Sequence, residues 1–193
     1  MITLKLFPKI LGVFKNENSE IYKDKLTKKC YYYKSKNIKK CDDWVSKVYN
    51  SNSTEFSLYE DDDFKELLDW IDEKVFEYCE NLKMKTNLSD KYAWFNIYKK
   101  HDFQEYHSHP ESTISAIYYL KGSEKSAKTH FIDFEYQKMN HKFNISDYNE
   151  DNSSSWYMPF EEGKLLVFRS DMFHCVEQHT LKTDRISLAI NYK

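Results

Sequence analysis

The clearest pattern of apolar positions along the chain lies between residues 61 and 83. Apolar side chains recur there every three or four residues, a spacing that predicts an α-helix with one apolar face. These positions are Phe64, Leu67, Leu68, Ile71, Val75, Tyr78, Cys79 and Leu82. Three aspartates, residues 61–63, stand where the N-terminus of a helix favours acidic groups. The opposite face is acidic, so we expect this helix to pack on the core and to carry no chemistry.

After residue 87 the pattern changes to short runs of aromatic and β-branched residues. Five runs are predicted to be strands, at residues 92–99, 113–121, 129–134, 164–169 and 185–192. No helical pattern lies between them, which favours an antiparallel sandwich or barrel over alternating strands and helices. The polar stretch 137–155 is long enough to be either a lid or a tolerated insertion.

Composition and charge narrow the class of protein. A chain of 193 residues is enough for one domain, and an aromatic content of 17 % excludes a disordered chain. The net charge of −2 argues against nucleic acid as a partner. Residues 1–50 hold 12 lysines and 5 acids, whereas residues 51–90 hold 4 lysines and 12 acids. We therefore expect the two segments to neutralise each other, although the lysine-rich segment is also a candidate contact surface.

The ends of the chain and the cysteines bear on its compartment. Residues 1–15 lack an apolar stretch of signal-peptide length, and no window approaches a membrane span. The four cysteines are far apart and form no CxxC pair: Cys30, Cys41, Cys79 and Cys175. We expect free thiols in a protein of the cytoplasm, with no membrane contact and no cysteine-rich zinc module.

Candidate chemistry begins with the triplet His107-Ser108-His109. On extended backbone, residues two apart point to the same side, so both imidazoles would face one point. A strand led in by a turn at Gly163 ends shortly before His174, which could supply a third ligand. The pattern therefore predicts a metal site.

The arginines give a second signal. Only two of the 29 basic residues are arginine, so an arginine here indicates a need for its forked guanidinium. Arg185 lies eleven residues after His174 at the start of a predicted strand, and Ser187 follows on the same face. The other, Arg169, is expected to be solvated.

Five short motifs occur in order along half of the chain. They are Trp94-Phe95-Asn96; His107-Ser108-His109-Pro110; Ser115-Ala116-Ile117-Tyr118-Tyr119; Gly163 to Ser170 followed by His174; and Arg185-Ile186-Ser187 followed by Asn191. In this order and spacing the chain resembles the iron(II)/2-oxoglutarate-dependent dioxygenase superfamily, in particular small oxygenases of bacteria and phages. The resemblance implies a mainly β fold, a double-stranded β-helix (jelly roll) with supporting N-terminal helices. It also implies one domain over residues 1–193, with an extension and helices in 1–90 and the catalytic core in 91–193.

The resemblance further implies Fe(II) as the metal and 2-oxoglutarate and O₂ as cosubstrates. Members of the superfamily release succinate and CO₂ while they hydroxylate a peptide side chain, as prolyl hydroxylases do, or a small molecule. The implied iron ligands are His107, His109 and His174. Arg185, with Ser187, stands where the family holds the distal carboxylate of 2-oxoglutarate. Tyr119 stands where related prolyl hydroxylases place a tyrosine on that carboxylate, and Tyr98 and Asn96 would line the site.

One departure from the family concerns the third ligand. The superfamily usually binds iron through His-x-Asp/Glu and a distal histidine, whereas His109 occupies the acidic position here. Three arrangements are open: a three-histidine site, a pair formed by His109 and Glu111, or a carboxylate from Asp133. We favour the three-histidine site because H-x-H belongs to the pattern of the most similar group.

Two other functions compete with this interpretation. One is a cupin-like three-histidine enzyme that does not use 2-oxoglutarate, and the other is a catalytically silent jelly-roll binding module. The Arg185-x-Ser187 pair argues against the cupin-like enzyme, which has no need of a dicarboxylate clamp. The identity of the substrate does not follow from the sequence, since one fold serves many reactions.

Overall fold

The apolar runs of the C-terminal half pair into the larger of two antiparallel sheets. The computed structural model describes residues 2, 8–36, 45–53, 56–85, 88–135 and 144–193. The larger sheet has the strand order β1-β8-β5-β10-β3-β2. Its strands are β1 (Leu11–Lys15), β8 (Lys164–Arg169), β5 (Ile114–Lys121), β10 (Arg185–Tyr192), β3 (Lys91–Tyr98) and β2 (Tyr49–Asn50).

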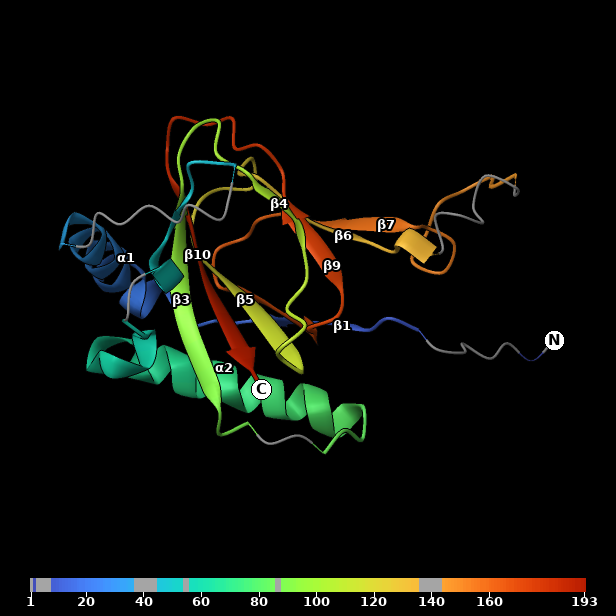
Figure 1. Cartoon of the computed structure of the whole chain (residues 1–193), viewed down its shortest axis with the longest axis horizontal. Coiled ribbons are helices and arrows are strands. Elements are labelled where there is room, and N and C mark those ends of the chain that lie inside the picture. Colours follow the sequence, from blue (N-terminus) through green and yellow to red (C-terminus); the bar gives the residue numbers. More distant parts are fainter. Residues whose placement is uncertain (1, 3–7, 37–44, 54–55, 86–87, 136–143) are drawn as a thin grey trace.

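A smaller sheet faces the larger one (Figure 1). Its strand order is β4-β9-β6-β7, and every pairing is antiparallel. The strands are β4 (Gln104–His107), β9 (Phe173–Val176), β6 (Thr129–Ile132) and β7 (Ser155–Met158). The two sheets together form the sandwich that the sequence predicts.

The helix predicted at 61–83 is helix α2, Asp62–Asn81. The side chain of Asp61 caps its N-terminus by accepting a hydrogen bond from the backbone N–H of Asp63 at 2.9 Å. The buried positions are those of the predicted apolar face: Phe64, Leu67, Leu68, Ile71, Val75, Tyr78 and Cys79. This prediction is confirmed.

A second long helix, α1 (Ser19–Lys36), agrees with the supporting N-terminal helices that the resemblance implies, although no apolar pattern predicts its bounds. Its buried apolar residues are only Tyr22, Leu26 and Cys30, four residues apart in a lysine-rich sequence. Helices α1 and α2 cover the outer face of the larger sheet, and two 3₁₀ turns, Ser51–Ser53 and Leu58–Glu60, lie near β3 (Figure 1).

Alternation along strand β5 divides the core in two. Ala116, Tyr118 and Leu120 belong to the cluster shared with the helices. Ile117 and Tyr119 belong to a second cluster with residues of the smaller sheet. One face of the sheet therefore anchors the fold, and the other faces the space between the sheets.

The five predicted strands correspond to β3, β5, β6, β8 and β10, although β6 ends early, at Ile132. The shorter strands β1, β2, β4, β7 and β9 were not predicted. Of the stretch 137–155, residues 137–143 lie outside the described part, and strand β7 begins at its last residue. Gly163 has a φ of 80°, a left-handed conformation that suits glycine, and so supports the turn predicted before β8.

The predicted neutralisation between the lysine-rich and acidic segments is observed at the start of α2. Lys29 lies 3.1 Å from Asp61 and 2.7 Å from Asp63, and Lys25 lies 2.7 Å from Asp63. Residues 1, 3–7 and 37–44 of the lysine-rich segment lie outside the described residues, and Cys41 is among them. The other three cysteines are free thiols. Among the described residues, no helix is long and apolar enough to cross a membrane.

Candidate active site

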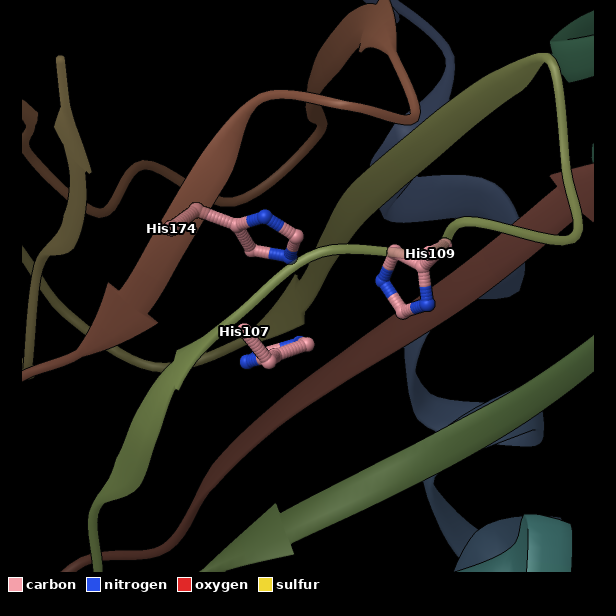
Figure 2. Close-up of side chains that lie close together, drawn as sticks. All are labelled: His107, His109 and His174. Carbon is pink, nitrogen blue, oxygen red and sulfur yellow. The ribbon is translucent and has the colours of Figure 1, made fainter. Parts of the chain in front are cut away.

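Three histidines, two on strands of the smaller sheet and one in a loop, lie close together (Figure 2). His107 ends β4, His109 follows in the next loop, and His174 lies on β9 directly opposite His107. One nitrogen from each of the three rings can serve as a metal ligand, and these three nitrogens lie within 4.8 Å of one another. The centroids of the His107 and His174 rings are 4.3 Å apart. The structure thus brings together the three histidines that the sequence singled out.

Backbone carbonyls orient two of these rings. The Nδ1 atom of His107 lies 2.7 Å from the carbonyl oxygen of Glu105, and Nδ1 of His174 lies 3.0 Å from that of Met172. Because a carbonyl only accepts, Nδ1 carries the proton in both rings. The Nε2 atom of each neutral ring then has the lone pair that a metal requires.

The electrostatic surroundings keep the three imidazoles neutral. Burial lowers the pKa of His107, and burial together with His107 lowers the pKa of His109 to about 4. Burial lowers the pKa of His174 well below its ordinary value, and the neighbouring His107 adds to this effect. Neutral imidazoles bind divalent metals without first losing a proton.

The two carboxylates considered as alternative ligands lie apart from the cluster. Glu111 is exposed, two residues beyond His109. Asp133 forms an ion pair with Lys9 at 3.1 Å and accepts a hydrogen bond from the backbone N–H of Glu135. Among the described residues, the group able to hold a metal consists of three histidines and no carboxylate.

Arg185 is completely buried at the start of β10 and lines the same pocket as the three histidines. Its Nε donates to the carbonyl of Ala127 at 3.0 Å, Nη1 donates to Ser187 Oγ at 3.1 Å, and Nη2 donates to Thr129 Oγ1 at 3.4 Å. No ion pair joins it to an acidic residue in the described parts of the chain. Burying a guanidinium without a counter-ion costs free energy, so we expect an anion from outside the chain to bind beside Arg185.

The sequence predicted three further residues around this anion site. Asn96 and Tyr98 line the pocket, and the hydroxyl of Tyr98 donates to Gln104 Oε1 at 2.7 Å. Tyr119 is not among the residues that line the pocket. Its ring centroid lies 5.3 Å from Cζ of Arg185, and its hydroxyl donates to Thr129 Oγ1 at 2.7 Å. Tyr119 therefore contacts the arginine, and its hydroxyl is used within the protein.

Two buried polar atoms among the pocket-lining residues have no hydrogen-bond partner in the described structure. They are Nε1 of Trp94 and Oδ1 of Asn96. An unsatisfied buried polar group costs about 1–3 kcal/mol, so both atoms point to a ligand in the pocket. The sequence predicts no role for Trp94, which stands in the first of the five motifs. Trp94, Asn96 and Tyr98 are spaced two apart along β3 and so lie on one face, and this spacing was the sequence signal for Trp94 in the pocket.

The residues present fit a divalent metal and a dicarboxylate. Three neutral imidazoles suit iron as well as other transition metals. Aromatic rings shield the cluster from water: Phe168 and Phe131 have centroids 4.9 Å and 5.9 Å from that of His174. Arg185 adds a fixed cation to the same pocket.

Two antiparallel sheets with a pocket lined by three histidines and a buried arginine define a candidate metal-dependent enzyme. A family model described as "Putative 2OG-Fe(II) oxygenase" matches residues 92–191, just over half of the chain. The chain belongs to this family, whose members use Fe(II) and 2-oxoglutarate. The superfamily, enzyme class and cofactors predicted from the sequence are confirmed.

Solved structures of low sequence identity share the fold. A prolyl-4-hydroxylase of Pseudomonas putida is 13 % identical with a TM-score of 0.67, over 96 % of this chain and 92 % of that one. A viral collagen prolyl hydroxylase from Paramecium Bursaria Chlorella virus-1 is 15 % identical with a TM-score of 0.58, over 95 % and 96 %. The carbocyclase SnoK from nogalamycin biosynthesis is 10 % identical with a TM-score of 0.66, over 95 % and 79 %. The predicted double-stranded β-helix is confirmed. No curated protein matches the chain significantly.

Proposed function

We propose that this enzyme is a hydroxylase that acts on a peptide side chain or a small molecule, with release of succinate and CO₂ from 2-oxoglutarate. His107, His109 and His174 hold Fe(II), and Arg185 with Ser187 holds the distal carboxylate of 2-oxoglutarate. Bound iron supplies the activation of O₂ that attack on an unactivated C–H bond requires. The catalytic core spans residues 91–193, and residues 1–90 support it within a single domain.

The observation that carries this proposal is the buried, unpaired Arg185 in the pocket of the three histidines. A guanidinium has five N–H donors. Nε, Nη1 and Nη2 each make one of the three hydrogen bonds described above, so Nη1 and Nη2 each have a second N–H that these bonds do not use. Two donors on one planar fork match the two oxygens of a carboxylate.

Ser187 extends this clamp. Its Oγ accepts from Arg185 Nη1, so its own hydroxyl proton remains able to donate to the same carboxylate. A cupin-like enzyme without 2-oxoglutarate would have no use for such a pair. The clamp therefore favours a dicarboxylate cosubstrate over a metal site alone.

The remaining pocket groups orient what is bound. Nε1–H of Trp94 offers a donor and Oδ1 of Asn96 an acceptor, while Phe131 and Phe168 exclude water beside His174. Prolyl hydroxylases are among the structures of similar fold, one of them in complex with a peptide fragment of hypoxia inducible factor. SnoK is described as a carbocyclase from nogalamycin biosynthesis, so we propose small molecules as well as peptides as the class of substrate.

The test begins under anaerobic conditions. Fe(II) and 2-oxoglutarate added to the protein should produce a visible charge-transfer band. Admission of O₂ should then yield succinate, faster with a true substrate, and a product heavier by one oxygen. Metal binding without the band would support a cupin-like enzyme, and absence of metal binding would support a silent module. Proline-containing and proline-free peptides of equal length test the peptide substrate.

A further inference from the structure

His179 is completely buried and has no role in the proposed chemistry. Its Nδ1 accepts a hydrogen bond from the backbone N–H of Ala127 at 3.3 Å, and its Nε2 lies 2.7 Å from the carbonyl oxygen of Thr183. The carbonyl can only accept and the amide can only donate. The ring is therefore the neutral tautomer with the proton on Nε2, and both of its nitrogens are used.

Glu177 makes two hydrogen bonds to Lys128, the residue that follows Ala127. Its Oε1 accepts from the backbone N–H of Lys128 at 2.8 Å, and the backbone N–H of Glu177 donates to the carbonyl of Lys128 at 3.2 Å. The N–H of Lys128 belongs to the same peptide group as the carbonyl of Ala127. That carbonyl accepts from Nε of Arg185 at 3.0 Å.

One peptide group thus links a carboxylate to the buried guanidinium. The order of groups is the Glu177 carboxylate, the N–H of Lys128, the carbonyl of Ala127 and Nε–H of Arg185. Hydrogen bonds in such a chain polarise one another, and the carboxylate makes the carbonyl a better acceptor. His179 holds Ala127 from its other side through the preceding peptide group.

We propose that Glu177 and His179 are positioning residues that fix the Arg185 clamp through the backbone of Ala127 and Lys128. The proposal rests on the proposed function of Arg185. The guanidinium is planar, so the bond from Nε to Ala127 sets the plane in which Nη1 and Nη2 lie. Any loosening of the Ala127 carbonyl therefore turns both donors away from the distal carboxylate of 2-oxoglutarate.

Substitutions of Glu177 separate this positioning from simple electrostatics. Glu177→Ala removes the acceptor, and we expect the dissociation constant of 2-oxoglutarate to rise about tenfold, the scale of one hydrogen bond to a charged group. Glu177→Gln keeps an acceptor oxygen and should stay within about twofold of wild type. If Glu177 acted only through its negative charge, its removal would lower the dissociation constant of 2-oxoglutarate, because a negative charge repels a dianion.

Two conservative substitutions of His179 separate its two hydrogen bonds. Asn places an amide group near the position of Nδ1, so His179→Asn keeps an acceptor for the N–H of Ala127. Gln places one near Nε2, so His179→Gln keeps only the donor to Thr183. We expect His179→Gln to weaken 2-oxoglutarate binding about five- to tenfold and His179→Asn to weaken it less than about threefold. A merely structural role would lower the melting temperature of both variants without this difference.

The measurement is the anaerobic titration of the Fe(II)-loaded full chain with 2-oxoglutarate and, in parallel, with 2-oxobutyrate, which lacks the distal carboxylate. Glu177→Ala and His179→Gln should weaken 2-oxoglutarate only and leave Fe(II) affinity unchanged. His130→Gln is the control, because His130 contacts the other oxygen of Glu177 at 3.3 Å. Equal losses for both acids, or no loss with 2-oxoglutarate, would overturn the positioning role. If wild type itself binds no 2-oxoglutarate, the proposed function fails instead.

Discussion

The substitution Arg185→Lys tests the proposed clamp while it keeps the positive charge. The three donors that Arg185 uses within the protein reach Ala127, Ser187 and Thr129. An ammonium has three donors in all, against five for a guanidinium. A lysine that replaced all three internal bonds would have none left for a ligand. A lysine that turned to the ligand would leave buried acceptors unsatisfied.

The magnitude of the effect follows from this count. A hydrogen bond to a charged group contributes about 1.5–3 kcal/mol, and the substitution removes at least one of the two offered to the carboxylate. Each 1.4 kcal/mol corresponds to a factor of ten, so we expect the dissociation constant of 2-oxoglutarate to rise by about 10- to 150-fold. The affinity for the metal should change less than about twofold, because the hydrogen bonds of Arg185 go to Ala127, Ser187 and Thr129 and not to the three histidines.

The assay is calorimetric titration of 2-oxoglutarate into the Mn(II)-loaded variant, with Mn(II) binding measured separately. Arg169→Lys is the matched control, since Arg169 is exposed and pairs with Asp171 at 2.6 Å. That variant should bind both ligands as wild type does. Unchanged 2-oxoglutarate affinity in Arg185→Lys would show that the clamp lies elsewhere. An equal loss of metal would show that the substitution disturbs the whole site.

Three further predictions concern the metal and the core. His174→Ala should abolish metal binding in equilibrium dialysis, because it removes one of three ligands and leaves the fold of β9 in place. Glu111→Gln and Asp133→Asn should leave metal affinity unchanged in the same assay, and loss of metal in either would defeat the three-histidine site. Leu68→Ala should lower the free energy of unfolding in urea by about 2–5 kcal/mol, because Leu68 is buried in the core between α2 and the larger sheet. Phe76→Ala on the exposed side of α2 should cost less than about 1 kcal/mol, and equal losses would mean that the apolar face was assigned wrongly.

The parts of the fold that the sequence predicts are those where burial imposes a regular period. Helix α2 presents seven buried positions on one face, and β10 alternates over eight residues, so both patterns exceed chance. Helix α1 has a stripe of only Tyr22, Leu26 and Cys30 between lysines, too thin to recognise. Strands β4 and β7 have four residues each and are partly exposed, so their apolar pattern is weak.

The candidate site was predictable where residue type alone indicates chemistry. The pair His107 and His109, the distal His174 and the rare Arg185 have side chains suited to a metal or an anion. The contacts of Arg185 with the carbonyl of Ala127 and with Thr129 were not predictable. Every residue carries a backbone carbonyl, so nothing in the sequence marks the one that meets a guanidinium.

Irregular strand pairing is a further reason why periodicity alone could not build the site. In the described pairings, the register shifts at two places: between Ile186 and Ser187 on β10, and between Gln104 and His107 on β4. The first shift lies within the Arg185–Ser187 clamp and the second directly precedes the histidine triplet. Because side chains on a strand alternate between faces, a shift of register re-aims the residues beside it. Strand β10 itself stays regular, because its pairing with β3 runs unbroken from Arg185 to Tyr192. Its alternation buries Ile186, Leu188 and Ile190 against the helices and turns Arg185 and Ser187 into the pocket.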